Sequence, residues 1–466
     1  MADALTRIAG ELFAHAAPAE RWLVDPRLGL LTAVTRQPPQ PGAPSGWVGF
    51  GAHVADTTVY APWTTDRYGF GAALGEPGRA RRAAVGEAVE RYCGNIVPPG
   101  LPVASYAELV AAGHRAVDPA GLALYSAAQY AEPGFPFVPF TPDLRVPWVR
   151  GTCLHTGADT FVPASLVHLN LPRTGPATNA LSYAGIATGT DRAHAERFAL
   201  EELLERDATA LWWTAGPPAP RIADAGPILD RLGDFHIGGG TVLLRQVPSG
   251  FGVPVVAAFI EDVTAAVVAF GSACRADARE AAAKALVEAV GMYTLTLKLL
   301  DPGSDVWAAI AEGIIPRHVY RPYRPDRSYR DAFRPDLRDL VDLPAVAQLY
   351  LDPRMQGEPL DRLRAATPAT TLAAMPSVAG GTAREVYLER LAAAGLSAVS
   401  VELTTPDVAA AGLRVVRVVV PGLYGNAPPA FALHGGRRLH TEPVARGWRT
   451  GPLTDADLAR PPIPLA

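Results

Sequence analysis

The chain has 466 residues, of which 49% are hydrophobic and 19% are charged, and its formal net charge at pH 7 is −4. These values are typical of a folded globular protein, and they exclude a disordered chain and any general attraction to nucleic acid or anionic membrane. No apolar run approaches the ~20 residues of a membrane span and no signal peptide is visible, so we expect a cytoplasmic protein.

The first half of the chain predicts a lead-in region followed by two long helices. Residues 1–60 predict a short N-terminal lead-in with a helix, a hairpin-like segment and a proline-rich loop. The first long helix is expected from about Arg79 to Gly94, a residue typical of a helix C-cap. Proline-dense residues 132–147 connect it to a predicted hairpin and then to the second long helix, which ends before the proline-rich residues 216–220.

The middle of the chain predicts three strands and a helix. The helix is expected over 277–293, with Asp277 as its N-cap and Glu280 completing a capping box. The segments rich in valine and alanine that predict strands are 240–248, 253–262 and 265–273.

The last third predicts a long excursion and then a return to regular structure. Residues 301–362 are polar and aperiodic, which predicts a long excursion or a partly mobile loop. Within it, arginine and tyrosine alternate over 317–334, and we expect a solvated loop there, with a peptide-binding surface as the alternative. A helix capped by Thr382 and two buried strands follow, so strands and helices alternate and the fold class is α/β.

The sequence Glu-x-x-Glu-Arg occurs in both long helices, once at 87–91 and once at 202–206. This spacing places both glutamates and the arginine of each copy on one face of the helix, near an apolar stripe. Two such faces brought together would gather four carboxylates, which is costly unless cations fill the space, and hard divalent cations prefer oxygen ligands. A magnesium–nucleotide site is one interpretation, and ordinary charge pairing on two surface helices is the other.

Common catalytic motifs are missing from the sequence. There is no Walker-type phosphate loop, so any use of ATP needs an unrelated site. There is also no nucleophile-elbow serine and no His-Glu-x-x-His pair, so the sequence does not support a hydrolase or a zinc protease.

Several segments together resemble the YcaO family. They are AVGEAVERYCG, GIATGTDRAHAERFALEELLERDA and AKALVEAV, a long C-terminal stretch over 395–425, and the ending RPPIPLA. The resemblance is in particular to the azoline-forming cyclodehydratases of ribosomal peptide natural-product pathways, and the ending is similar to their proline-alternating tail. The resemblance covers about residues 60–466 and implies one YcaO domain over 61–466, with mixed sheets packed with helices around a carboxylate-lined Mg–ATP site.

The resemblance implies ATP and Mg2+ as cofactors. Family members add a Cys, Ser or Thr side chain of a precursor peptide to the preceding carbonyl, whose oxygen is phosphorylated and leaves. The products are a thiazoline or oxazoline, ADP and phosphate. The implied metal ligands are Glu87, Glu90, Glu202 and Glu205, and the implied nucleotide contacts are these glutamates with Arg91 and Arg206, of which Arg206 is also catalytic.

Some positions depart from the family's pattern and put nucleotide contacts in doubt. Ala83 replaces a serine, Phe70 a lysine, Thr190 an asparagine, His194 a glutamate and Gly291 a glutamine. Glu196 lies two residues beyond His194, and Arg460 takes the place of the first alternating proline of the tail.

The C-terminal tail and the partners are also implied by the resemblance. The tail at 460–466 is expected to reach the active site, with Pro462, Pro464 and the Ala466 carboxylate acting in catalysis. The lead-in is too short for a leader-peptide-binding domain, so a separate partner protein is expected to deliver the ribosomal precursor peptide. A homodimer is expected only through the resemblance. Two alternatives stay open: a YcaO enzyme that forms a thioamide or an amidine, and a non-catalytic scaffold that binds precursor peptide or a catalytic partner.

Overall fold

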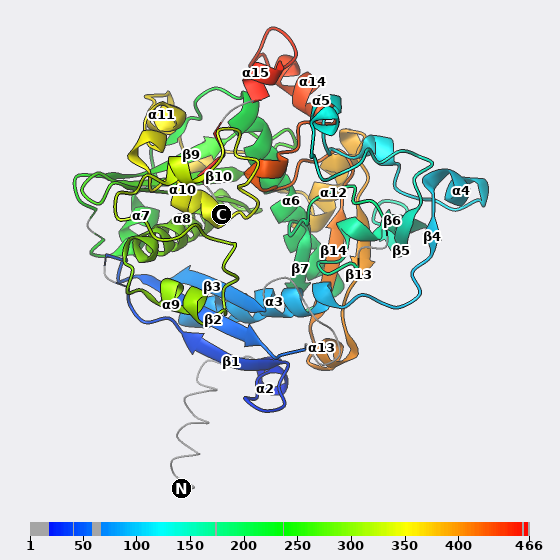
Figure 1. Ribbon diagram of the computed structural model, residues 1–466, viewed down its shortest axis with the longest axis horizontal. Coiled ribbons are helices and arrows are strands. Elements are labelled where there is room, and N and C mark those ends of the chain that lie inside the picture. The colour runs from blue at the N-terminus through cyan, green and yellow to red at the C-terminus, as the bar shows by residue number, and fades with distance from the viewer. Residues whose placement is uncertain are drawn as a thin grey trace, which may run out of the picture.

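The structure is a computed structural model that describes residues 18–40, 42–57, 67–172, 175–235, 237–458 and 461–464. Its strands form three sheets, and three long helices lie among them (Figure 1). Within the described ranges, no helix is long and apolar enough to cross a membrane.

The regular elements follow the order expected for an α/β chain. The strands are β1 (Leu31–Arg36), β2 (Trp47–Val54), β3 (Tyr68–Leu74), β4 (Val103–Ala104), β5 (Val146–Cys153), β6 (Asp159–Pro163), β7 (Ile186–Gly189), β8 (Arg221–Ile222), β9 (Thr241–Val247), β10 (Val255–Asp262), β11 (Val267–Cys274), β12 (Ala369–Thr370), β13 (Val399–Glu402) and β14 (Arg414–Val419). The helices are α2 (Glu20–Leu23), α3 (Pro77–Asn95), α4 (Tyr106–Ala111), α5 (Ala127–Ala131), α6 (Arg192–Ala215), α7 (Gly226–Leu229), α8 (Ala278–Leu300), α9 (Asp305–Ala311), α10 (Ala345–Leu349), α11 (Asp361–Arg364), α12 (Ala383–Ala393), α13 (Pro406–Ala410), α14 (Arg438–Ala445) and α15 (Asp455–Leu458).

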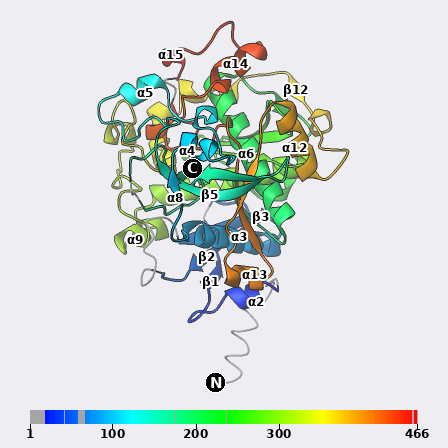
Figure 2. The same cartoon turned by 90° about the vertical axis from the view of Figure 1, so that its right-hand side faces the viewer.

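The three sheets are mostly antiparallel. The first has the order β1–β2–β3, and the second has the order β11–β10–β9–β8–β12, in which only β12 and β8 run parallel. The third has the order β4–β5–β13–β14–β7, with β6 paired to β5. In both views, the first sheet with α2 lies at one end of the molecule and α14 and α15 lie at the other (Figures 1 and 2).

Each long helix packs on strands and reaches towards the other two. Helix α3 covers β2 and β3, α8 covers β10 and β11, and α6 packs against β7 and β14. Helix α3 also contacts β7, α6 contacts β11, and α8 contacts β3. The three helices therefore converge near the centre of the molecule, where their polar faces can meet (Figure 1).

Glycines on β3 allow α3 to lie unusually close to its sheet. A Cβ at Gly69 would fall 2.3 Å from the backbone nitrogen of Ala88, and one at Gly71 would fall 2.2 Å from that of Ala84. No side chain fits at such distances, so both positions require glycine. The close contact brings the backbone of Phe70, which lies between the two glycines, within reach of polar side chains on α3.

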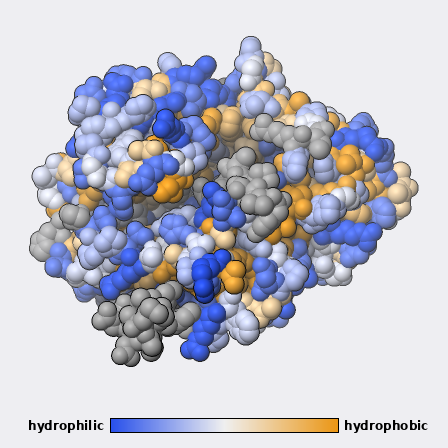
Figure 3. Space-filling view, turned by 60° about the horizontal axis from the view of Figure 1, so that its bottom comes forward, coloured by the Kyte–Doolittle hydropathy of each residue, from blue (hydrophilic) through white to orange (hydrophobic). Residues whose placement is uncertain are grey.

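The molecular surface is mixed where the end that carries the first sheet is brought forward. Hydrophilic and hydrophobic residues are interspersed on the face that Figure 3 presents. Near this end of the chain, Trp22 and Leu28 are the largest exposed apolar side chains, with 81% and 90% of their surface accessible. The strands themselves bury most of their valines and alanines, so the hydrophobic core lies between the layers.

Two sequence-based expectations need correction. Helix α8 continues to Leu300, seven residues beyond the predicted end, because buried Thr294, Thr296 and Leu299 extend its inner face. The segment 301–362 is not a structureless excursion: it contains α9, α10 and the start of α11, and it buries Tyr329 and Tyr350. Its order depends on contacts between side chains far apart in sequence, which periodicity does not report.

Candidate magnesium and nucleotide site

The two Glu-x-x-Glu-Arg copies lie on α3 and α6, and both of these helices pack against β7. One oxygen of each glutamate is fixed by a donor from an adjacent strand or loop. The Phe70 amide donates to Glu87 Oε2 (3.0 Å), the Thr188 amide to Glu90 Oε1 (2.7 Å), the Gly185 amide to Glu202 Oε2 (2.9 Å), and the Ser272 hydroxyl to Glu205 Oε1 (2.7 Å). Backbone amides therefore orient three of the four carboxylates. Glu90 of α3 and Glu202 of α6 accept from amides only three residues apart, so the structure brings carboxylates of the two copies near each other.

Helix α8 contributes a fifth carboxylate that the sequence analysis missed. Glu288 is paired with Lys284, one turn earlier on the same helix. Burial raises the pKa of Glu87, and the charge of Glu288 also acts to raise it. The sequence segment AKALVEAV indicates this position, because its Lys284 and Glu288 are four residues apart and share one face of a helix.

Arginines from both motifs lie among the carboxylates. Arg91 donates to Glu87 Oε1 at 2.6 Å, and its guanidinium lies 4.5 Å from the centre of the Tyr183 ring. Arg206 lies 3.3 Å from Glu205 Oε1 and 3.9 Å from Glu202 Oε1. Each arginine therefore neutralises part of the acidic charge of its own helix.

The remaining acidic charge is not balanced by the arginines. Burial raises the pKa of Glu90 to about 8, with further upward contributions from the Glu87 and Glu202 charges and an opposing one from Arg91. Burial likewise raises the pKa of Glu205, and Arg206 only partly offsets this. Carboxyl groups that resist ionisation in this way mark a place where a cation would be stabilising.

The donor set fits a magnesium ion that is shared with a nucleotide. Carboxylate oxygens are hard ligands, and Mg2+ is usually held by one or two of them together with phosphate oxygens and water. In the described part of the chain, no three His, Cys, Asp or Glu side chains lie close enough to form a metal cage by themselves. The buried Nε of Arg206 has no hydrogen-bond partner among the described residues, which suits a site awaiting an anion.

A buried arginine on β14 supports this arrangement from behind. The guanidinium of Arg417, a residue only 1% exposed, donates to the backbone carbonyls of Val167, Ser182, Tyr183 and Ala184 at 2.6 to 3.2 Å. These bonds fix the loop that leads into β7. The next residue of that loop, Gly185, donates to Glu202, so Arg417 positions a candidate metal ligand through the backbone.

The structure gives a physical account of several departures from the family's pattern. At Phe70 the backbone amide, which any residue other than proline provides, binds Glu87. His194 Nδ1 lies 3.1 Å from Thr190 Oγ1, so these two substituted positions contact each other.

The remaining departures have separate surroundings on α3, α6 and α8. Glu196 is buried in ion pairs with Arg192 and Arg384, at 2.8 and 2.7 Å, and so does not replace the missing glutamate. Ala83 is exposed on α3. Gly291 lies on α8 with the Trp47 ring nearby, 3.9 Å from where its Cβ would be.

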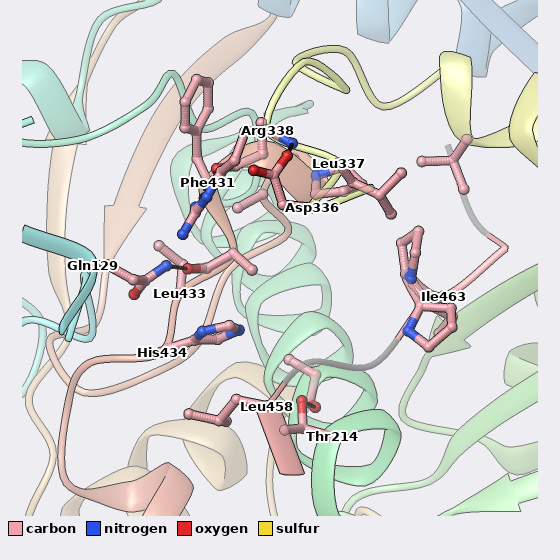
Figure 4. A pocket seen from close by; sticks show the side chains of 18 of the residues that line it. Gln129, Thr214, Asp336, Leu337, Arg338, Phe431, Leu433, His434, Leu458 and Ile463 are labelled. Atoms are coloured by element: carbon pink, nitrogen blue, oxygen red, sulfur yellow. Dashed lines mark hydrogen bonds between the residues drawn. The ribbon is translucent and has the colours of Figure 1, made fainter. Parts of the chain in front are cut away.

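The C-terminal tail runs into a cavity of about 1150 Å3 beside α6 (Figure 4). Arg206 and Trp213 line this cavity, as do Pro462 and Ile463 of the tail, and Pro464 is buried. Other walls come from the segments 126–136, 330–359 and 424–439. The described part of the tail, residues 461–464, is therefore packed against the protein. Arg460 and Ala466, for which roles were expected, lie outside the described residues.

Oxygen ligands and arginines at the junction of three helices, in a mixed α/β fold, define a protein built to bind a nucleotide through magnesium. A family model described as YcaO cyclodehydratase, ATP- and Mg2+-binding, matches residues 74–424. The chain belongs to the YcaO family. A comparison with curated proteins gave no significant match.

Solved structures share this fold. A heterocyclase in complex with substrate and cofactor superposes with a TM-score of 0.70 at 20% identity, over 94% of this chain and 56% of that one. YcaO from Methanopyrus kandleri, bound with AMPPCP and Mg2+, gives 0.56 at 18% identity, over 91% and 94% of the two chains. A chain of the E. coli microcin synthetase McbBCD complex gives 0.52 at 14% identity, over 87% and 94%.

These comparisons decide several of the predictions made above. The predicted family, the α/β fold of YcaO type and the cofactors ATP and Mg2+ are confirmed. The chain spans little more than half of the heterocyclase with which it superposes, so the activity of that whole protein does not transfer directly. The individual site residues and the domain boundary at residue 60 stay predictions, although β1 and β2 pair with β3 in one sheet.

Proposed function

We propose that this chain is an ATP- and Mg2+-dependent cyclodehydratase that converts Cys, Ser or Thr residues of a ribosomal precursor peptide into thiazoline or oxazoline rings. One observation supports the proposal above the rest: Arg206 belongs both to the carboxylate cluster and to the wall of the tail cavity. A nucleotide held by the cluster and a peptide lying in the cavity would meet at this side chain.

The proposed reaction removes one water from the peptide for each ring. The Cys, Ser or Thr heteroatom bonds to the preceding carbonyl carbon, and the carbonyl oxygen takes the γ-phosphoryl group of ATP, which leaves as ADP. The C–O bond then breaks, phosphate departs, and loss of the heteroatom and amide protons completes the C=N bond of the ring. Mg2+ held by the glutamates would supply neutralisation of the phosphate charge.

The residues of this chain would contribute positioning and charge. Glu87, Glu90, Glu202 and Glu205 would hold the metal ions, and Glu288 adds a fifth oxygen ligand from α8. Arg206 is oriented by its pairs with Glu205 and Glu202 and would stabilise charge on the transferring phosphoryl group. Arg91 and Lys284 keep their neighbouring carboxylates in place.

We further propose that the substrate is delivered by a separate leader-peptide-binding protein, in the cytoplasm. The similarity of fold to a chain of the microcin synthetase McbBCD complex supports a multi-protein assembly. A cavity above the ~300–1,000 Å3 typical of small-ligand pockets also suits a peptide better than a small molecule. A homodimer stays a prediction.

Mass spectrometry of a precursor peptide incubated with the chain, ATP, Mg2+ and the partner protein tests the proposal. We expect the loss of one water per ring together with the release of ADP and phosphate. Extending the chain beyond Ala466 should abolish ring formation and leave nucleotide binding unchanged. A folded chain that binds the precursor or its partner but no nucleotide would favour the non-catalytic scaffold, a second candidate because of the departures at Phe70 and Ala83.

A further inference from the structure

The tail is rich in proline, which limits how the protein can recognise it. Three of the four described tail residues, Pro461, Pro462 and Pro464, have no backbone N–H and cannot donate a hydrogen bond. Apart from the N–H of Ile463, the backbone of these four residues offers only carbonyl oxygens for hydrogen bonding. A protein that holds it in one register must therefore present side-chain donors at the right spacing.

Two buried aromatic side chains provide these donors. Trp213 Nε1, on α6, donates to the carbonyl of Pro461 at 2.9 Å. The Tyr350 hydroxyl, which follows α10, donates to the carbonyl of Pro462 at 2.5 Å. Successive carbonyls are thus held from two sides, and Ile463 packs against the hydrophobic core that contains both rings.

Both donors are rigid. The backbone carbonyl of Trp213 accepts a hydrogen bond from Arg362, whose guanidinium also lies 5.1 Å from the centre of the Trp213 ring. Tyr350 is 1% exposed, and burial raises the pKa of its hydroxyl, so the group stays protonated and able to donate. A rigid donor loses little conformational entropy when it binds, which makes it effective at positioning a flexible terminus.

Helix α6 connects this anchor to the candidate active site. Arg206 and Trp213 are seven residues apart, about two turns, and so lie on one face of the helix. The residues between them that line the cavity, Thr209 and Ala210, follow the same stripe. The distance from the tail to the carboxylate cluster is therefore set by one continuous helix.

We propose that Trp213 and Tyr350 are positioning residues, which hold the C-terminal tail in register with Arg206 for ring formation. The proposal rests on the proposed function, because the tail is given its role there. Neither residue is expected to touch the nucleotide. Their loss should slow the chemical step and leave nucleotide binding unchanged.

Single substitutions that remove only the donor atom test this proposal in the full chain with its partner. Trp213→Phe and Tyr350→Phe each keep an aromatic ring and lose one hydrogen bond to the tail. Trp212→Phe is the matched control, because its indole N–H donates at 2.9 Å to the Pro217 carbonyl and not to the tail. Thermal unfolding of all three variants would show that the fold is kept.

We expect Trp213→Phe and Tyr350→Phe to lower kcat for ring formation about tenfold, the change that an ordinary lost hydrogen bond gives. The Kd of a non-hydrolysable ATP analogue should stay within about twofold of that of the wild type, as a positioning role requires. Trp212→Phe should retain the wild-type kcat. Equal rates for Trp213→Phe and Trp212→Phe would overturn the proposal.

A second measurement does not depend on activity. In protein labelled with 5-fluorotryptophan, the eight tryptophans give separate 19F resonances. The resonances of Trp213 and Trp212 are assigned by their absence from the spectra of Trp213→Phe and Trp212→Phe. Deleting residues 461–466 should move the Trp213 resonance and leave that of Trp212 in place. If the wild type forms no rings, the proposed function fails while this test still decides whether the tail is anchored. An unmoved Trp213 resonance would overturn the anchoring.

Discussion

The amide of Thr188 donates a 2.7 Å hydrogen bond to Glu90 Oε1, which ties β7 to α3 across 98 residues of sequence. This bond needs an acceptor oxygen, but it does not need the negative charge of the carboxylate. A glutamine at the same place could keep the bond and remove the charge. The variant Glu90→Gln therefore distinguishes the structural role of Glu90 from its proposed role as a magnesium ligand.

Glu90→Gln should weaken binding of a magnesium–nucleotide complex with little change of fold. We expect the Kd of a non-hydrolysable ATP analogue to rise at least about tenfold, as is typical when a charged contact is lost. Calorimetric titrations at several Mg2+ concentrations measure this. Glu196→Gln is the control, because Glu196 is buried on α6 but paired with Arg192 and Arg384. An unchanged Mg2+ dependence in Glu90→Gln would remove Glu90 from the metal site.

Arg206→Met should slow ring formation far more than it weakens nucleotide binding. A charge aimed at a transferring phosphoryl group acts mainly in the transition state, where comparable arginines contribute roughly 10³-fold or more. Steady-state rates of phosphate release with precursor and partner give this comparison. Arg192→Met, on the exposed start of the same helix, should keep the wild-type rate. A similar loss in both variants would point to damage of the helix instead.

Arg417→Met should destabilise the whole protein. It would remove the guanidinium that donates to four backbone carbonyls, and breaking a buried charged network typically costs about 3–5 kcal/mol. Urea unfolding followed by circular dichroism measures the loss. Arg414→Met, three residues earlier on β14 and less buried, should cost under about 1 kcal/mol. Equal midpoints for the two variants would contradict the supporting role of Arg417.

His168 should make the protein sensitive to acid. The side chain is 3% exposed, both ring nitrogens lack a hydrogen-bond partner among the described residues, and burial next to Arg417 lowers its pKa to about 4. The unfolded chain takes up the proton near pH 6.5, so the stabilisation by neutral His168 is complete above that pH and is lost as the pH falls towards 4.

The variant His168→Leu removes this titration. Relative to it, the wild type should lose up to about 3 kcal/mol of unfolding free energy between pH 7 and pH 4. Urea unfolding of both proteins across this range measures the difference. A difference that does not depend on pH would show that His168 is already charged or is hydrated in the folded state.

The sequence predicted the parts of the fold whose order is local. Helix α12, with Thr382 and Glu385 forming its capping box, and the strands β9 to β11 follow from cap residues and short apolar runs. The Glu-x-x-Glu-Arg copies pointed to α3 and α6, and each motif's charges lie on one face. Local spacing was enough for these elements because each one depends on neighbours within a few residues.

The rest depends on contacts that no local pattern reports. Tyr350 lies in a polar segment, and its hydroxyl finds its acceptor in the tail, 112 residues later. Glu288 was not singled out in the sequence, because its charge acts on Glu87 only through the packing of α8. The anchoring of the tail by Trp213 likewise needs the fold, because an indole N–H carries no sequence signal for its acceptor.

Titration calorimetry with a non-hydrolysable ATP analogue and Mg2+ tests the central claim most directly, with wild type compared to Glu202→Ala/Glu205→Ala. The account predicts micromolar binding by the wild type and loss of that binding in the folded double variant, since two of the five carboxylates are removed. Equal binding by both proteins, or none by folded wild type with its partner present, would contradict a carboxylate-held magnesium–nucleotide site.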